Sequence, residues 1–178
     1  MTGFEDFNWG ALGLGFSAVL ALAWAVFAVR NRPSPTALVV GLAHIVVAGF
    51  HSVAPIRGLL DPNYVGYSFG MLSAASGWQV TALAGAVFVL AAVGAFNALA
   101  SDRRARIRVA ATSTLFLVNV GGAWLYNALT DLRGNVIQFG EYATIPGEAG
   151  TAILFVLFIA PFFLGALWAG KRALTPAA

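Results

Sequence analysis

His44 and His51 are the only histidines of the chain, and both lie in one uncharged apolar stretch. Seven residues turn a helix by about 700° and advance it by about 10 Å, so both side chains would project from nearly the same face. That separation is too large for one metal ion to bind both imidazoles. A haem takes axial ligands on its two opposite faces, so a bis-histidine haem would require a histidine from a partner subunit or from a second copy of the chain.

Two interpretations of these histidines remain open. Ionisable residues inside membrane segments commonly mark functional sites, and His51 lies near one end of its stretch, where it could contact a haem or a quinone. Alternatively, both histidines form interhelical hydrogen bonds in the interior of a helical bundle. We favour the structural role for His44, which falls near the middle of the stretch, and leave His51 undecided.

A second set of candidates consists of polar residues close to the ends of two apolar stretches. They could form a ligand-binding site or, with His51 paired to Asp61 or Asp131, the site of a surface enzyme. The alternative is a solvated rim of ion pairs, which contributes little to stability. The set comprises His51, Arg57, Asp61, Asp131, Arg133 and Glu141.

The stretch over residues 109–129 supplies a third set of candidates. Asn119 falls near its middle, where an amide without a hydrogen-bond partner would be costly. The adjacent Gly121 and Gly122, with Trp124 and Tyr126, could frame a flat pocket for a ring-shaped or lipid-like ligand. The same glycines would also permit close packing of two helices, so the pocket is one of two alternatives.

The elements that carry these residues are predicted from five long stretches without a charged residue. Of the 178 residues, 60% are hydrophobic and only 10% are charged, whereas about 25% of a soluble domain is charged. A helix of about 20 apolar residues crosses a bilayer and satisfies its own backbone hydrogen bonds. The sequence therefore predicts an all-α integral membrane protein, a single domain over 1–178 with five transmembrane helices at about 11–29, 36–54, 78–99, 109–129 and 151–170.

The charges between these stretches are sorted by sign, and this predicts the orientation of the chain. Eight of the ten Lys and Arg residues follow the first, third and fifth stretches, and six of the seven acidic residues lie on the opposite side. The positive-inside rule then places the N-terminus outside and the C-terminus in the cytoplasm. The outer loops would be 55–77 and 130–150. The first is fairly apolar, and it could form an interfacial helix over 66–76 or, as we favour, a cap that shields the outer end of the bundle. The basic connection over 101–108 would be a short inner turn.

Several missing residue types exclude classes of function. Without cysteine, the chain has no disulfide, no thiolate metal site and no iron–sulfur cluster. The single lysine, Lys171, lies at the end of the fifth stretch, which excludes a buried retinal Schiff base. The absence of acidic residues within the stretches argues against a carboxylate proton relay. Basic residues at segment ends are explained by lipid head groups and membrane insertion, so they do not indicate a nucleic-acid partner.

These observations together predict a small polytopic membrane protein with a non-catalytic role, located in a prokaryotic cytoplasmic membrane. It would bind an apolar or lipid-like ligand, or act as a subunit of a larger membrane complex with another membrane protein or with further copies of itself. The alternatives are a haem- or quinone-binding redox anchor, and a small transporter or channel with a polar path past His44, Thr112 and Asn119. We predict no metal and no cofactor outside the haem or quinone alternative.

Overall fold

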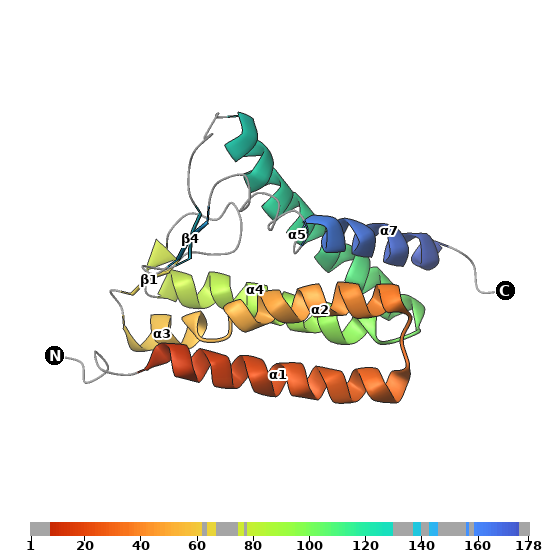
Figure 1. Ribbon diagram of the computed structural model, residues 1–178, viewed down its shortest axis with the longest axis horizontal. Coiled ribbons are helices and arrows are strands. Elements are labelled where there is room, and N and C mark those ends of the chain that lie inside the picture. The colour runs from red at the N-terminus through yellow and green to blue at the C-terminus, as the bar shows by residue number, and fades with distance from the viewer. Residues whose placement is uncertain are drawn as a thin grey trace.

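The computed structural model describes residues 8–61, 64–66, 75–76, 78–129, 137–139, 143–145, 156 and 159–174, and these are mainly helical (Figure 1). The helices are α1 (Trp9–Asn31), α2 (Pro35–Phe50), α3 (Ala54–Leu60), α4 (Trp78–Ala98), α5 (Arg103–Leu129) and α7 (Ala160–Leu174). Two short antiparallel strand pairs join β1 (Val65–Gly66) to β2 (Ala75–Ser76) and β3 (Ile137–Phe139) to β4 (Ala143–Ile145).

Three of the described helical stretches are long and apolar enough to cross a bilayer. They are α1 with 23 residues, α2 together with α3 over Pro35–Leu60 with 26 residues, and α4 with 21 residues. About 20 residues suffice to span the hydrocarbon core. The chain is therefore a helical membrane protein, as predicted, and these stretches overlap the first three predicted spans. The spans predicted at 109–129 and 151–170 stay predictions. Helix α5 covers the range 109–129, and α7 covers the second half of the range 151–170.

The helices α1, α2 and α4 lie side by side, and a tryptophan joins them (Figure 1). The indole Nε1 of Trp24 in α1 donates a hydrogen bond of 3.0 Å to the carbonyl oxygen of Ala95 in α4. Its ring also lies against Gly41 of α2, where an added Cβ would come within 2.7 Å of Cζ2. Most other side chains of α1 are exposed, including Leu14, Val19, Leu22, Val26 and Val29. In a bilayer this apolar surface faces lipid or another protein.

The second predicted span, 36–54, is interrupted near its end. The regular helix α2 stops at Phe50, His51 caps it, and α3 starts at Ala54 with Pro55 in its first turn. Proline suits a helix start because it lacks the backbone N–H that an interior position would need. The span predicted at 36–54 lies within the apolar stretch Pro35–Leu60, and the turn that precedes this proline was not anticipated.

Side chains satisfy the carbonyl groups around this break. The carbonyl oxygen of Gly49 accepts hydrogen bonds from the hydroxyls of Ser52 at 2.8 Å and of Ser17 in α1 at 3.2 Å. The carbonyl oxygen of Pro55 accepts one from the hydroxyl of Thr81 in α4 at 2.9 Å. Away from water, backbone groups need such partners, so the break is held by hydrogen bonds to both neighbouring helices.

At the opposite end of these helices, short connections are set by capping residues. Ser34 caps α2 ahead of Pro35, and Arg32 has a left-handed backbone with φ of 46°. The N–H of Ala105 donates to Asp102 Oδ1 at 2.9 Å, which caps α5 and lowers the pKa of that carboxyl. Because of this cap, α5 already begins at Arg103. The turn predicted over 101–108 is thus mostly helix.

The helix α5 runs beside α4 and α7 at its start and then leaves the other helices at an angle (Figure 1). Contact with α7 is close, because Gly165 faces Ser113 of α5 and Val40 of α2. An added Cβ at Gly165 would lie 2.9 Å from Val40 Cγ1 and 3.1 Å from Ser113 Cβ. These small residues bring α2, α5 and α7 together around one core.

The interfacial helix considered as an alternative over 66–76 is not found at either end of that range. Val65 pairs with Ser76 and Gly66 with Ala75 in the antiparallel pair of β1 and β2. Between these strands, residues 67–74 lie outside the described residues. A run of apolar residues does not distinguish a short helix from a hairpin by periodicity alone.

We expect Gly94→Ala to destabilise the fold by about 1–3 kcal/mol, the usual cost of inserting a methyl into a packed core. Its Cβ would lie 2.5 Å from His44 Nε2 and 2.8 Å from Thr112 Oγ1. The matched control is Gly15→Ala in α1, whose Cβ would meet nothing within 4 Å. That variant should be neutral or slightly more stable, since alanine favours a helix over glycine. Thermal unfolding in detergent compares the two, and equal melting temperatures would contradict the packing described.

Candidate functional site

The imidazole of His44 is held by hydrogen bonds at both ring nitrogens. Nδ1 lies 2.8 Å from the carbonyl oxygen of Val40, and Nε2 lies 3.0 Å from the hydroxyl of Thr112 in α5. A carbonyl oxygen can only accept, so Nδ1 must donate, and Nε2 of the neutral ring then accepts from the hydroxyl. This assignment leaves no ring nitrogen of His44 for a haem iron.

The hydroxyl of Thr112 links His44 to the backbone of α5. It lies 3.0 Å from the carbonyl oxygen of Arg108 and 3.2 Å from that of Val109. A hydroxyl has one proton, so the hydrogen bond to His44 Nε2 leaves these two carbonyl oxygens to the backbone N–H groups of α5. The side chains of His44 and Thr112 are buried, with exposed fractions of 0% and 5%. They form a closed polar pair in an apolar core.

Aromatic rings and a glycine seal this pair. The ring centroids of Phe116 and Phe162 lie 5.6 Å and 5.1 Å from that of His44, and 5.2 Å from each other. On another side, Gly94 leaves just enough room for the imidazole. Such packing favours a structural role for His44. It disfavours a polar path through this part of the bundle, because the groups that would line the path are in contact with each other.

His51 lies at the break between α2 and α3, beyond the last regular turn of α2. Its Nδ1 lies 3.0 Å from the carbonyl oxygen of Val47, and the residue is buried, with 6% of its surface exposed. His51 is the C-terminal cap of α2, and its imidazole contacts the carbonyl four residues earlier through Nδ1, as that of His44 does. The Nδ1 contact engages one of its ring nitrogens.

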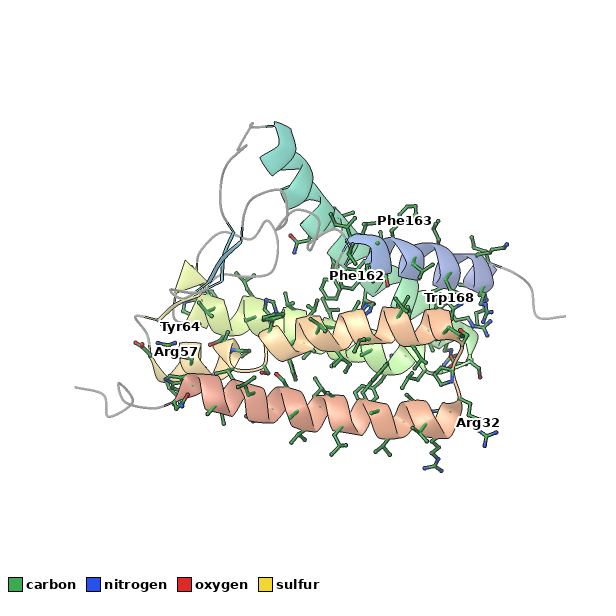
Figure 2. The ribbon with its side chains drawn as sticks, in the orientation of Figure 1. Arg32, Arg57, Tyr64, Phe162, Phe163 and Trp168 are labelled. Carbon is green, nitrogen blue, oxygen red and sulfur yellow. The ribbon has the colours of Figure 1, made fainter. Side chains whose placement is uncertain are left out.

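Arg57 lies at the same end of the bundle, and its guanidinium is close to two aromatic rings. The Cζ atom of its guanidinium lies 4.2 Å from the ring centroid of Tyr64 and 5.8 Å from the ring of Trp9, the first residue of α1. Figure 2 shows Arg57 and Tyr64 together at this end, which we call the α3 end. Arg32 and Trp168 lie at the opposite end, which we call the basic end (Figure 2). Arginine stacks on aromatic rings through its planar face.

The predicted outer cluster is therefore brought together only in part. His51, Arg57 and Asp61 lie in the break, in α3 and at the C-terminal cap of α3, so all three belong to the α3 end. Asp131, Arg133 and Glu141 lie outside the described residues. Whether they join this set stays a prediction.

The pocket predicted around Gly121 and Gly122 is tested only at the level of the backbone. Helix α5 continues through both glycines to Leu129, so the glycines do not end it. Asn119 is half-buried on this helix. Trp124 and Tyr126 lie on the part of α5 for which only the backbone is described.

Sequence reasoning missed the partners of the candidate residues. Trp9 and Tyr64 were not assigned to Arg57, although Trp9 opens the first helix, at the level where aromatic residues gather at a membrane interface. Phe116 and Phe162 beside His44 had no signal in the sequence, because aromatic residues in apolar helices are common. Gly94 had a weak one, since it belongs to a run of small residues in α4.

Within the described ranges, no three His, Asp or Glu residues come together as a metal site. Comparison of the chain with protein-family models, with curated proteins and with solved structures gives no match. The functional argument therefore depends on the geometry of the residues described above.

We expect Thr112→Val to lower the free energy of unfolding by about 0.5–2 kcal/mol, because it leaves His44 Nε2 without its donor. Valine has nearly the same shape as threonine, so packing against Gly94 is kept. Thr112→Ser retains the hydroxyl and is the control, with a smaller effect expected. Denaturation in detergent measures both. A Thr112→Val protein as stable as wild type would show that the hydrogen bond contributes nothing.

Proposed function

We propose that the chain is a five-span membrane protein of a prokaryotic cytoplasmic membrane, with its N-terminus outside and its C-terminus in the cytoplasm. The α3 end would face outward and the basic end inward. The distribution of basic residues supports this orientation. Arg32 follows α1, Arg103 begins α5, and Arg172 lies in the last turn of α7, all at the basic end. This distribution follows the positive-inside rule.

Single cysteines test this topology, because the natural chain has none. We expect Asn63→Cys, in the predicted first outer loop, to react with a membrane-impermeant maleimide added to intact cells. Ser101→Cys, between α4 and α5, should react only after the membrane is opened. Labelling of both positions from the same side would refute the proposed orientation.

We further propose a non-catalytic role in which the α3 end binds an apolar or lipid-like ligand. The observation that carries this proposal is the position of Arg57, whose Cζ lies over the rings of Tyr64 and Trp9 at the α3 end. A cation held on aromatic rings beside apolar helices suits a ligand with a polar end and an apolar body. The exposed Leu59 and Leu60 of α3 add apolar surface next to Arg57.

The alternatives have weaker support from the described residues. Transport past His44 is disfavoured because His44, Thr112 and Gly94 are in close contact. Haem ligation by His44 is disfavoured because both ring nitrogens are engaged. A haem or quinone at His51 stays an alternative, and a visible absorption band or an extractable quinone in the purified protein would favour it.

Mass spectrometry of the gently solubilised protein tests ligand binding directly. We expect wild type to retain a bound lipid-like molecule, and Arg57→Gln to retain at least about tenfold less, since a hydrogen bond to a charged group contributes about 1.5–3 kcal/mol. Arg104→Gln, at the exposed start of α5 on the basic end, is the matched control and should bind as wild type does. Equal retention by all three proteins, or none by wild type, would contradict the proposal.

The same measurement tests a second candidate function, that of a subunit in a membrane complex. The observation in its favour is α1, in which only Trp24 and Ala28 are buried. Its remaining apolar surface would suit the helix of another membrane protein or of a second copy. A mass corresponding to a second chain would support this candidate, and a pure monomer would oppose it.

A further inference from the structure

We propose that the α3 end recognises a phosphate group, through the guanidinium edge of Arg57. This inference rests on the proposed function and narrows it, because it assigns the polar end of the ligand to a phosphate oxyanion. The phosphate would belong to a lipid head group or to a soluble phosphate compound, and the chemistry of recognition is the same for both.

The first step of the argument is the position of Arg57 over two aromatic rings. Its Cζ lies 4.2 Å from the ring centroid of Tyr64 and 5.8 Å from that of Trp9, so both rings attract the cation. The five N–H donors of a guanidinium lie in its plane and point outward from its edge. A cation–π contact holds the charge without a carbonyl or carboxylate oxygen, so it does not supply a conventional acceptor to these donors.

The second step is a comparison with arginines at the basic end. Arg103 Nε donates to the carbonyl oxygen of Ala173 at 3.0 Å, and Arg108 Nη1 lies 3.4 Å from Asn97 Oδ1. For Arg57, by contrast, the described part of the chain provides ring contacts to the guanidinium but no hydrogen-bond acceptor. We therefore assign these donors of Arg57 to the ligand.

The third step is the match between donor and ligand. The planar fork of arginine binds two oxygens of a phosphate or carboxylate at once, and charge makes these hydrogen bonds strong. Trp9, Tyr64 and the exposed Trp78, the first residue of α4, are of the type that lies at the level of lipid head groups. At that level the abundant oxyanion is phosphate. The exposed Leu59 and Leu60 beside Arg57 would contact the apolar part of a lipid.

Binding of defined lipids to the full-length detergent-solubilised protein tests this inference. Three probes share the same acyl chains: phosphatidylglycerol, which has a phosphate, and diacylglycerol and glucosyl diacylglycerol, which do not. We expect wild type to bind phosphatidylglycerol at least about tenfold more tightly than either of the others. Arg57→Gln should lose this preference, because its binding of phosphatidylglycerol falls to the level of the two lipids without phosphate. Arg57→Lys should keep part of the preference, because it retains the charge but not the fork.

The outcomes separate this inference from the proposed function. Equal binding of all three lipids by wild type would overturn phosphate recognition and leave lipid binding intact. Binding of none of them would overturn both, unless sodium phosphate alone binds in an Arg57-dependent manner, which supports the phosphate site and assigns it to a soluble compound. A preference that survives in Arg57→Gln would also overturn the inference, provided that circular dichroism shows the variant to be folded. Arg104→Gln should match wild type throughout.

Discussion

The hydrogen bond between His44 and Thr112 is the contact on which the arrangement of the core depends. It joins α2 to α5 inside an apolar bundle, where a polar side chain without a partner is costly. Around it, Phe116 and Phe162 contribute the apolar packing of α5 and α7. Displacing any of these helices would expose the imidazole to hydrocarbon, so one polar pair restricts the positions of three helices.

The polar groups at the helix break and the indole of Trp24 also have partners within the protein, whereas the buried Ser113 Oγ and Trp168 Nε1 have none among the described residues. The interruption between α2 and α3 exposes carbonyl groups, and hydroxyls from Ser17, Ser52 and Thr81 cover them. Trp24 has its indole N–H bound to Ala95. Arg57 differs from these groups, since its contacts in the described residues are with ring faces. That contrast is why the α3 end, and not the core, is the place where a ligand is expected.

Much of the helical framework could be predicted from the sequence, because the length and polarity of a membrane segment are constrained by the bilayer. The first and third segments were placed to within about two residues of α1 and α4. The structure differs where local chemistry decides: Pro55 starts a new helix, Asp102 caps one earlier than expected, and β1 pairs with β2 at the ends of a range for which a helix was one alternative. Trp9, which contacts Arg57, and Thr112, which bonds to His44, belong to other helices. The periodicity of a single segment does not predict how two helices pack against each other.

Three glycines have a consequence that extends beyond this one chain. Gly41 contacts Trp24, Gly94 contacts His44, and Gly165 contacts Ser113, each across an interface between two helices. In each pair, the larger side chain occupies space that the glycine leaves empty. During divergence, a side chain gained at the glycine position would be tolerated only after the opposite residue becomes smaller. Positions 41 and 24, 94 and 44, and 165 and 113 should therefore co-vary among homologous sequences, and such pairs would identify distant relatives that overall identity no longer reveals.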